Sequence, residues 1–271
     1  MIPSRAPAVA GIAAALALAL AAPAQAVPTT SRCLAVAERL APVMRVAYRP
    51  AALQATEIRI TFTGHSTFVI ETAKGIKIAT DYAGYAGGIL PDVATMNHAH
   101  TSHYTDYPDP RIQHVLRGWN PAGGHAEHNL ELEDVYVRNV PTNIRRWYGG
   151  GTEEFGNSIF IFETAGLCIG HLGHLHHELT DQQLGQIGTL DIVMAPVDGS
   201  YTLDVEGMVN VLKSLHTRLV LPMHYFGTAT LARFIDRLGR DFAIVQSESP
   251  SIVISRATLP ESPQLLVLPG Y

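Results

Sequence analysis

The segment Asn97-His98-Ala99-His100-Thr101-Ser102-His103 carries three histidines within one short stretch of chain. Neutral imidazole is the side chain that binds metal ions most often in proteins. Residues two apart in an extended segment project to the same side, so His98 and His100 are expected to hold one ion. A polar loop with adjacent histidines is the alternative, and one cluster alone does not decide between the two.

Further histidines in distant segments favour the metal site. The segment His171-Leu172-Gly173-His174-Leu175-His176-His177 repeats the pattern later in the chain, and His224 follows the apolar run 219–222. A protein metal site needs three or four ligands, and histidines at strand ends can be aimed at one point. The sequence therefore predicts a metal site assembled from several parts of the chain.

Alternating apolar residues on both sides of the first cluster predict β-strands. These strands are expected at 58–62, 67–70, 76–79, 115–116, 134–140, 158–162 and 167–169. The second half alternates expected helices (180–187, 205–215 and 228–238) with expected strands (190–196, 219–222, 243–245 and 251–255). A β-meander followed by βα units predicts an α/β fold with two sheets face to face and helices outside.

The first residues are typical of a secretory signal peptide. Arg5 is followed by the apolar run 8–22, and Ala24-Gln25-Ala26 supplies the small residues of a cleavage site before Val27. The run is shorter than the roughly twenty residues that span a bilayer. We therefore expect a signal peptide over 1–26, a helical segment over 27–56 and one domain over 57–271. The protein is expected to be periplasmic or secreted, with no membrane span.

The composition of the chain limits the kinds of binding partner to be expected. The chain has 19 basic and 24 acidic residues, a formal net charge of −5 and no run of lysines or arginines. This balance argues against nucleic acid, so a small-molecule substrate is the expected partner. The oligomeric state is not indicated. Cys33 and Cys168 are the only cysteines. A bridge between them is one alternative, and two isolated thiols are the expected outcome.

In its histidine segments and in the motifs given below, the chain resembles the metallo-β-lactamase-fold superfamily, specifically its ascorbate-6-phosphate-lactonase-like branch. The resemblance runs from Glu57 to the C-terminus. The motifs that carry it are Phe62-Thr63-Gly64-His65-Ser66-Thr67-Phe68, Thr80-Asp81, the 98–103 loop, Gly156-Asn157, His171-Leu172-Gly173, Leu179-Thr180, Pro196-Val197, Tyr201-Thr202 and Pro222-Met223-His224-Tyr225. The resemblance implies a single-domain αββα sandwich with a metal site at one edge between the sheets.

The departures from the family pattern alter the expected ligands. Ser102 occupies the position of the family aspartate in HxHxDH, His174 replaces the bridging aspartate, and Ile144 stands near the position of a further family histidine. A decayed enzyme would lose ligands without gaining substitutes, so we favour a site rebuilt from histidines. The expected ligands are His98, His100 and His174 around one ion, with His103 and His224 completing it or holding a second.

Such a site implies a metal-dependent hydrolase that acts through a metal-bound hydroxide, because three imidazoles leave the charge of the ion uncompensated. The expected substrate is a small ester, lactone or phosphodiester, an anion being favoured. Ser102 and His177 are candidate helpers in proton transfer. Zinc is the expected divalent ion, with iron, manganese and copper as alternatives. The alternative function is a non-hydrolytic metal- or ligand-binding protein, or an iron or copper oxidoreductase on the same scaffold.

Overall fold

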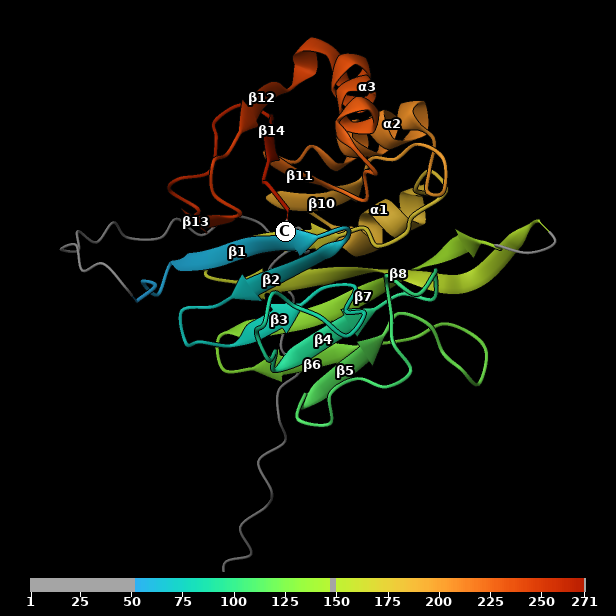
Figure 1. The fold of residues 1–271 in the computed structure, drawn as a ribbon, viewed down its shortest axis with the longest axis vertical. Coiled ribbons are helices and arrows are strands. Elements are labelled where there is room, and N and C mark those ends of the chain that lie inside the picture. Colours follow the sequence, from blue (N-terminus) through green and yellow to red (C-terminus); the bar gives the residue numbers. More distant parts are fainter. Residues whose placement is uncertain (1–51, 147–149, 271) are drawn as a thin grey trace, which may run out of the picture. The chain divides into compact units, whose positions relative to one another are not determined.

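The computed structural model describes residues 52–146 and 150–270, whose strands form two sheets (Figure 1). The first sheet has the order β13-β1-β2-β3-β4-β5 and the second β12-β14-β11-β10-β9-β8-β7-β6. The strands of the first sheet are β1 (Glu57–Gly64), β2 (Thr67–Glu71), β3 (Lys77–Ala79), β4 (Val93–Met96), β5 (His114–Arg117) and β13 (Ser251–Ser255). Those of the second are β6 (Asn129–Leu132), β7 (Val135–Arg145), β8 (Thr152–Thr164), β9 (Leu167–His171), β10 (Ile192–Pro196), β11 (Leu219–Met223), β12 (Ala243–Gln246) and β14 (Gln264–Val267).

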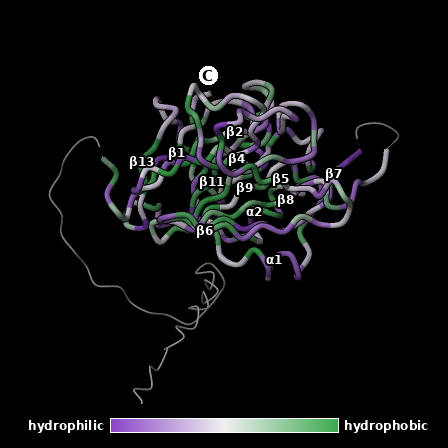
Figure 2. The backbone as a smooth tube through the Cα atoms, turned by 90° about the horizontal axis from the view of Figure 1, so that it is seen from below, coloured by the Kyte–Doolittle hydropathy of each residue, from purple (hydrophilic) through white to green (hydrophobic). Residues whose placement is uncertain are grey.

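The alternation of side chains along the strands separates two apolar layers of the second sheet. In β10, Ile192 and Met194 face the core between the sheets, whereas Val193 and Ala195 face a second core. Phe68 of β2 joins Ile192 in the core between the sheets. Successive strand residues point to opposite faces, so one strand serves both layers. Figure 2 shows the hydrophobic stretches gathered along β8, β9 and β11.

The second core lies under the helices α1 (Asp181–Ile187), α2 (Val205–Leu215) and α3 (Thr228–Leu238), which Figure 1 shows beside β10 and β11. Helix α1 begins with a capping box between Thr180 and Gln183, a pairing that satisfies backbone amides left open at a helix start. The buried residues of α2 recur at helical spacing and pack into this core. The bounds of α2 and α3 confirm the helices that the sequence predicts.

The other face of the first sheet has a different cover. Tyr82, Ala86 and Ile112 pack there on Val69 and Ala94. These three residues belong to the segments between strands, so in the described part of the chain this outer layer is made of loops and the helices lie on the second sheet only. The two-sheet α/β fold is confirmed. None of the described helices is long and apolar enough to cross a membrane.

The state of Cys168 differs from the prediction, and the predicted N-terminal segments lie almost entirely outside the described residues. Cys168, in β9, is disulfide-bonded, so the expectation of an isolated thiol at this position is wrong. The only other cysteine, Cys33, lies outside the described residues, as do the signal peptide and nearly all of the helical segment expected over 27–56. Cys168 lies in an apolar strand, and the pattern of apolar residues alone carries no signal for a bridge.

Candidate metal centre

The strands deliver the candidate ligands to one edge of the two sheets. Strands β3 and β4 run parallel, and β1 runs in the same direction because β2 pairs antiparallel with both β1 and β3. Strands β9, β10 and β11 are parallel to one another in the second sheet. The histidines and aspartates of the site follow the carboxyl ends of these strands: His65, Asp81, His98 to His103, His174, Asp198 and His224. The carboxyl ends of parallel strands are where open α/β sheets form their ligand sites.

Three histidines are each held at Nδ1, which turns Nε2 toward the others. His103 Nδ1 donates to Asp81 Oδ2 at 2.6 Å, and His224 Nδ1 donates to Asp198 Oδ1 at 3.1 Å. His100 Nδ1 shares a hydrogen bond of 2.7 Å with the hydroxyl of Ser102. The Nε2 atoms of His100 and His224 are 3.2 Å apart. A partner on one ring nitrogen fixes the orientation of a metal-ligating histidine and the tautomer that leaves the other nitrogen for the ion.

His65 and His174 complete the cluster. The ligand nitrogens of His65, His100, His103 and His224 all lie within 4.8 Å of one another. The His174 ring is centred 4.9 Å from His103, 5.0 Å from His224 and 5.2 Å from His100. Five imidazoles from four strand ends therefore surround one point of the edge, and we call them the histidine cluster.

Several of these nitrogens are buried without a hydrogen-bond partner. They are Nε2 of His65, Nε2 of His103 and both ring nitrogens of His174. Leaving a buried polar atom unpaired costs about 1–3 kcal/mol, so such a group in a native protein needs an explanation. A bound cation explains it, since a metal ion accepts the lone pair that no hydrogen bond uses.

The backbone around the cluster is held in conformations that are unfavourable for these residues. His65, Asp81 and His224 have φ angles of +52°, +42° and +56°. The backbone N–H of His224 donates to the carbonyl oxygen of His65 at 2.7 Å, which joins the first sheet to the second at the site. Non-glycine residues at positive φ cost free energy and persist where the surroundings fix them, often at functional sites.

Close packing beneath the cluster fixes the two loops that carry it. Asn97 donates to Asp81 Oδ1 at 2.8 Å and accepts from the backbone N–H of Ser158 at 2.7 Å. Asn157 accepts from the backbone N–H of His174 at 2.8 Å. Gly173, at φ +62°, has no room for a side chain, since an added Cβ would lie 2.4 Å from atoms of both asparagines. Gly156-Asn157 is one of the motifs found in the sequence, whereas no local pattern indicates the roles of Asn97 and Asp198.

The environment lowers the pKa of four of the cluster histidines. Burial, together with the neighbouring imidazoles, lowers the pKa of His174 to about 2, of His65 to about 3 and of His100 to about 4. Burial also lowers the pKa of His103, although the adjacent Asp81 opposes this effect. A neutral imidazole keeps the lone pair that a metal ion requires, so the site is prepared for a cation at neutral pH.

The two aspartates stay ionised behind the histidines. Burial alone would raise the pKa of Asp81, but electrostatic interactions with His171 and His103 and hydrogen bonds from His103 and Asn97 lower it to about 2. Burial also opposes ionisation of Asp198, but its hydrogen bonds with His224 and Thr202 hold the pKa well below the usual range. The negative charge of the site therefore lies on residues that orient the histidines.

The structure brings four of the five sequence-predicted ligands together: His100, His103, His174 and His224. It places His98 elsewhere. The His98 ring stacks on Trp119 with centroids 5.1 Å apart, and His98 Nδ1 lies 2.5 Å from Glu153 Oε1. His65 takes its place in the cluster, although the sequence analysis assigned a family motif, and no ligand role, to this residue.

The two candidate helpers also occupy different places. Ser102 contacts His100 and so acts on a cluster residue. His177 Nε2 accepts from the backbone N–H of Asn143 at 3.1 Å, and His176 Nδ1 lies 3.0 Å from the carbonyl oxygen of the same residue. These contacts tie the loop after β9 to β7, next to Ile144, which is buried.

The residues present fit a divalent ion. Two bonds of about 2.05 Å from zinc to imidazole nitrogens, at the tetrahedral angle, separate the nitrogens by about 3.3 Å. The 3.2 Å between His100 Nε2 and His224 Nε2 matches this separation. The unpaired nitrogens of the other three histidines supply more ligands than four-coordinate zinc needs. The donor set is nitrogen throughout, which suits zinc, copper, iron and nickel better than magnesium or calcium.

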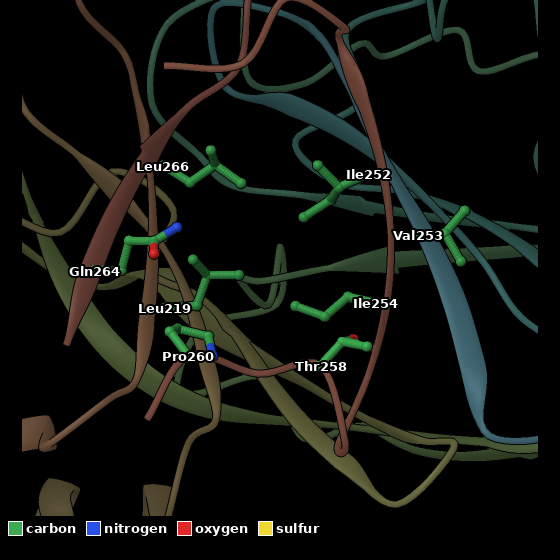
Figure 3. A pocket seen from close by; sticks show the side chains of 8 residues that line it. All are labelled: Leu219, Ile252, Val253, Ile254, Thr258, Pro260, Gln264 and Leu266. Carbon is green, nitrogen blue, oxygen red and sulfur yellow. The ribbon is translucent and has the colours of Figure 1, made fainter. Parts of the chain in front are cut away.

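An apolar pocket on another part of the fold lacks reactive groups. It has a volume of about 280 Å³ and lies between β13 and the pair β11 and β14 (Figure 3). Its lining consists of Leu219, Ile252, Val253, Ile254, Thr258, Pro260, Gln264 and Leu266. None of these side chains titrates or binds a metal readily, so this pocket offers no candidate metal ligand.

Comparison with known proteins agrees with this geometry. The family described as the beta-lactamase superfamily domain matches residues 59–224, more than half of the chain and the span from β1 to the last cluster histidine. The chain belongs to this superfamily. Among its superfamily relatives is a UPF0173 metal-dependent hydrolase of Thermoplasma volcanium, 24% identical over 189 residues that cover 62% of this chain and 84% of that protein.

Solved structures of superfamily members share the fold. A metallo-β-lactamase superfamily protein of Thermotoga maritima superposes with a TM-score of 0.57 at 23% identity, covering 78% of this chain and 98% of that one. Igni18, a metallo hydrolase of Ignicoccus hospitalis, superposes with a TM-score of 0.51 at 20% identity, covering 80% of this chain and 97% of that one. At these identities the likeness establishes the fold, and the chemistry must be argued from the site.

Proposed function

We propose that this chain is a metal-dependent hydrolase of a small ester, lactone or phosphodiester. The observation that carries the proposal is the set of inward, unpaired imidazole nitrogens at the edge of the two sheets. The names of the UPF0173 relatives as metal-dependent hydrolases support the same class of reaction. The motifs of the ascorbate-6-phosphate-lactonase-like branch favour that branch within the superfamily.

The cluster histidines His65, His100, His103, His174 and His224 would hold the ion, with zinc as the proposed metal. When bound, such an ion polarises the scissile group as a Lewis acid and lowers the pKa of water. The chain itself orients the ligands. Asp81 and Asp198 fix the rings of His103 and His224, and Ser102 fixes the ring of His100. Neutral ligands leave the charge of the ion uncompensated, which favours an anionic or strongly polarised reacting group.

Aromatic side chains border the open side of the cluster. Phe226, 59% exposed, has its ring centred 5.3 Å from His224 and 5.9 Å from His65. Tyr201 packs against Phe226 with centroids 5.4 Å apart. An exposed aromatic pair beside the cluster can cover the apolar part of a bound substrate and exclude water from the reacting group.

The test is hydrolysis by the zinc-loaded protein of a panel that contains an aryl ester, a lactone and an aryl phosphodiester. We expect turnover of at least one class, lost in His224→Ala and retained in His125→Ala, because His125 is exposed and lies outside the cluster. Turnover that persists unchanged in His224→Ala would contradict the proposal. Elemental analysis of protein from the native compartment separates the alternatives, since iron or copper would favour an oxidoreductase.

We further propose that the protein is exported. The leader pattern around Arg5 and Ala24-Gln25-Ala26 supports export. The disulfide at Cys168 also supports it, because disulfides persist in oxidising compartments and are rare in the cytosol. Both features are compatible with a periplasmic or a secreted protein.

A further inference from the structure

A pocket next to the histidine cluster has a lining unlike that of the cluster itself. It has a volume of about 420 Å³. Its lining residues are His98, Trp119, Asn120, Pro121, Gly123, Gly124, Glu153, Glu154 and Phe155. His98 is two residues from His100, so the two Cα atoms are within about 7 Å. We call it the Trp119 pocket, and its lining residue His98 lies in the same loop as His100 of the cluster.

Stacked rings form one wall of the Trp119 pocket. The indole of Trp119 stacks on His98 at an interplanar angle of 24°, and Tyr104 packs against both rings at 5.5 and 5.6 Å between centroids. His98 is fixed further by Glu153 on Nδ1 and by its backbone N–H, which donates to the carbonyl oxygen of Gly156 at 2.9 Å. The wall is therefore held in place before any ligand arrives, which lowers the ordering cost of binding.

The carboxylates that line the pocket belong to Glu153, which pairs with His98, and to Glu154. Among the described residues that line it, Glu153 and Glu154 are acidic and none is a lysine or an arginine. Arg117 is not part of the lining, and its guanidinium lies 5.9 Å from the centroid of the Trp119 ring. Aromatic faces with nearby carboxylates attract organic cations and disfavour anions.

We propose that the Trp119 pocket binds an ammonium group of the substrate while the bond to be hydrolysed lies at the histidine cluster. This inference rests on the proposed hydrolase function. It narrows the substrate to small esters or phosphodiesters that carry a positive charge a few bonds from the reacting group. The charge of the metal ion favours a negative or polarised reacting group. The carboxylates of the Trp119 pocket favour a positive charge on the rest of the substrate.

A matched pair of esters tests the proposal. Acetylcholine and 3,3-dimethylbutyl acetate have nearly the same shape and differ in the positive charge. For the zinc-loaded protein we expect kcat/KM to be about tenfold higher for acetylcholine, in the range that a cation–π contact supplies. Trp119→Leu and Glu154→Gln should each reduce this preference, whereas Glu127→Gln, an exposed residue outside the lining, should preserve it. Equal kcat/KM values for the two esters would overturn the proposal.

A direct binding measurement tests the Trp119 pocket independently of hydrolysis. Calorimetry with tetramethylammonium chloride on the zinc-loaded protein should detect binding that Trp119→Leu abolishes and Glu127→Gln retains. Binding of tetramethylammonium without turnover of any member of the ester, lactone and phosphodiester panel would support the pocket and count against the hydrolase. Hydrolysis without tetramethylammonium binding would overturn the pocket and leave the hydrolase standing. Absence of tetramethylammonium binding would overturn the pocket, and absence of turnover on the panel of aryl ester, lactone and aryl phosphodiester would overturn the hydrolase. A melting curve of Trp119→Leu checks that this variant is folded.

Discussion

His100 Nε2 and His224 Nε2 lie 3.2 Å apart, although 124 positions separate the two residues in the chain. His100 follows β4 of the first sheet and His224 follows β11 of the second, so the contact joins the two sheets at their shared edge. Each ring is fixed from behind, His100 by Ser102 and His224 by Asp198. Two nitrogens at this separation, aimed at each other from opposite sheets, are placed to share one cation.

Asp198→Asn should weaken zinc binding by about 10- to 100-fold, the usual cost of removing the partner that orients a ligand. The amide can keep a contact with His224 Nδ1 but loses the charge that fixes the tautomer. A competition titration with a chromogenic chelator measures the affinity. The control is Asp204→Asn, which affects the N-cap of α2 and lies outside the cluster. Unchanged affinity in Asp198→Asn would show that this carboxylate has no role in metal binding.

Metal-free protein should lose stability as the pH falls from about 6.5 to about 4. The unfolded chain protonates its histidines below pH 6.5, whereas folded His65, His100 and His174 keep pKa values of about 3, 4 and 2. The unfolded state then binds more protons, so protonation favours unfolding. Asp81 acts in a lower window, since its folded pKa is about 2.

His174 allows a quantitative check of this pH dependence, because its side chain is only 4% exposed. One differential proton changes the free energy of unfolding by at most about 1.4 kcal/mol per pH unit. Urea unfolding at several pH values should therefore show a shallower slope for His174→Gln than for the original chain. His125→Gln, which changes an exposed histidine, should keep the original slope. A steeper slope for His174→Gln would contradict the assigned neutral state.

Most helices and strands could be predicted from local sequence patterns, and the strands that were missed have physical reasons. Helices α2 and α3 were predicted to their terminal residues because their apolar spacing and polar boundaries are local signals. Strands β4, β6 and β14, of four residues each, were missed, whereas the equally short β5 and β12 were predicted. A strand this short carries little periodic signal, and pairing in the sheet sets its position: β4 lies between β3 and β5, β6 at the edge beside β7, and β14 between β12 and β11.

The sequence predicted that histidines form the metal site, but it did not predict correctly which histidines lie together. His98 and His100 share the spacing that sends two side chains to one face of a strand, but the chain turns after Met96 and this rule no longer holds. His98 then stacks on Trp119, and His65 enters the cluster through a backbone at positive φ. The Nδ1 partners Asp81 and Asp198 come from other strands, a relationship that only the tertiary structure reveals.

Two assays on the secreted protein test the predicted export and the disulfide at Cys168. N-terminal sequencing should begin at or within a few residues of Val27, as the pattern Ala24-Gln25-Ala26 predicts. Denatured but unreduced protein should give no reaction with a thiol reagent, because Cys168 is disulfide-bonded. An uncleaved chain recovered from the cytoplasm would contradict export, and two reactive thiols would contradict the bridge.

Metal content of three proteins tests the central claim that the histidine cluster binds a divalent cation through its inward nitrogens. Each protein is stripped with chelator, dialysed against zinc and assayed by elemental analysis. The original chain and His98→Ala should retain zinc, since His98 points to Trp119 and Glu153. His224→Ala should lose at least tenfold in zinc affinity, because a direct ligand matters at least as much as the group that orients it. Undiminished zinc in His224→Ala, or no zinc in the original chain, would contradict the account.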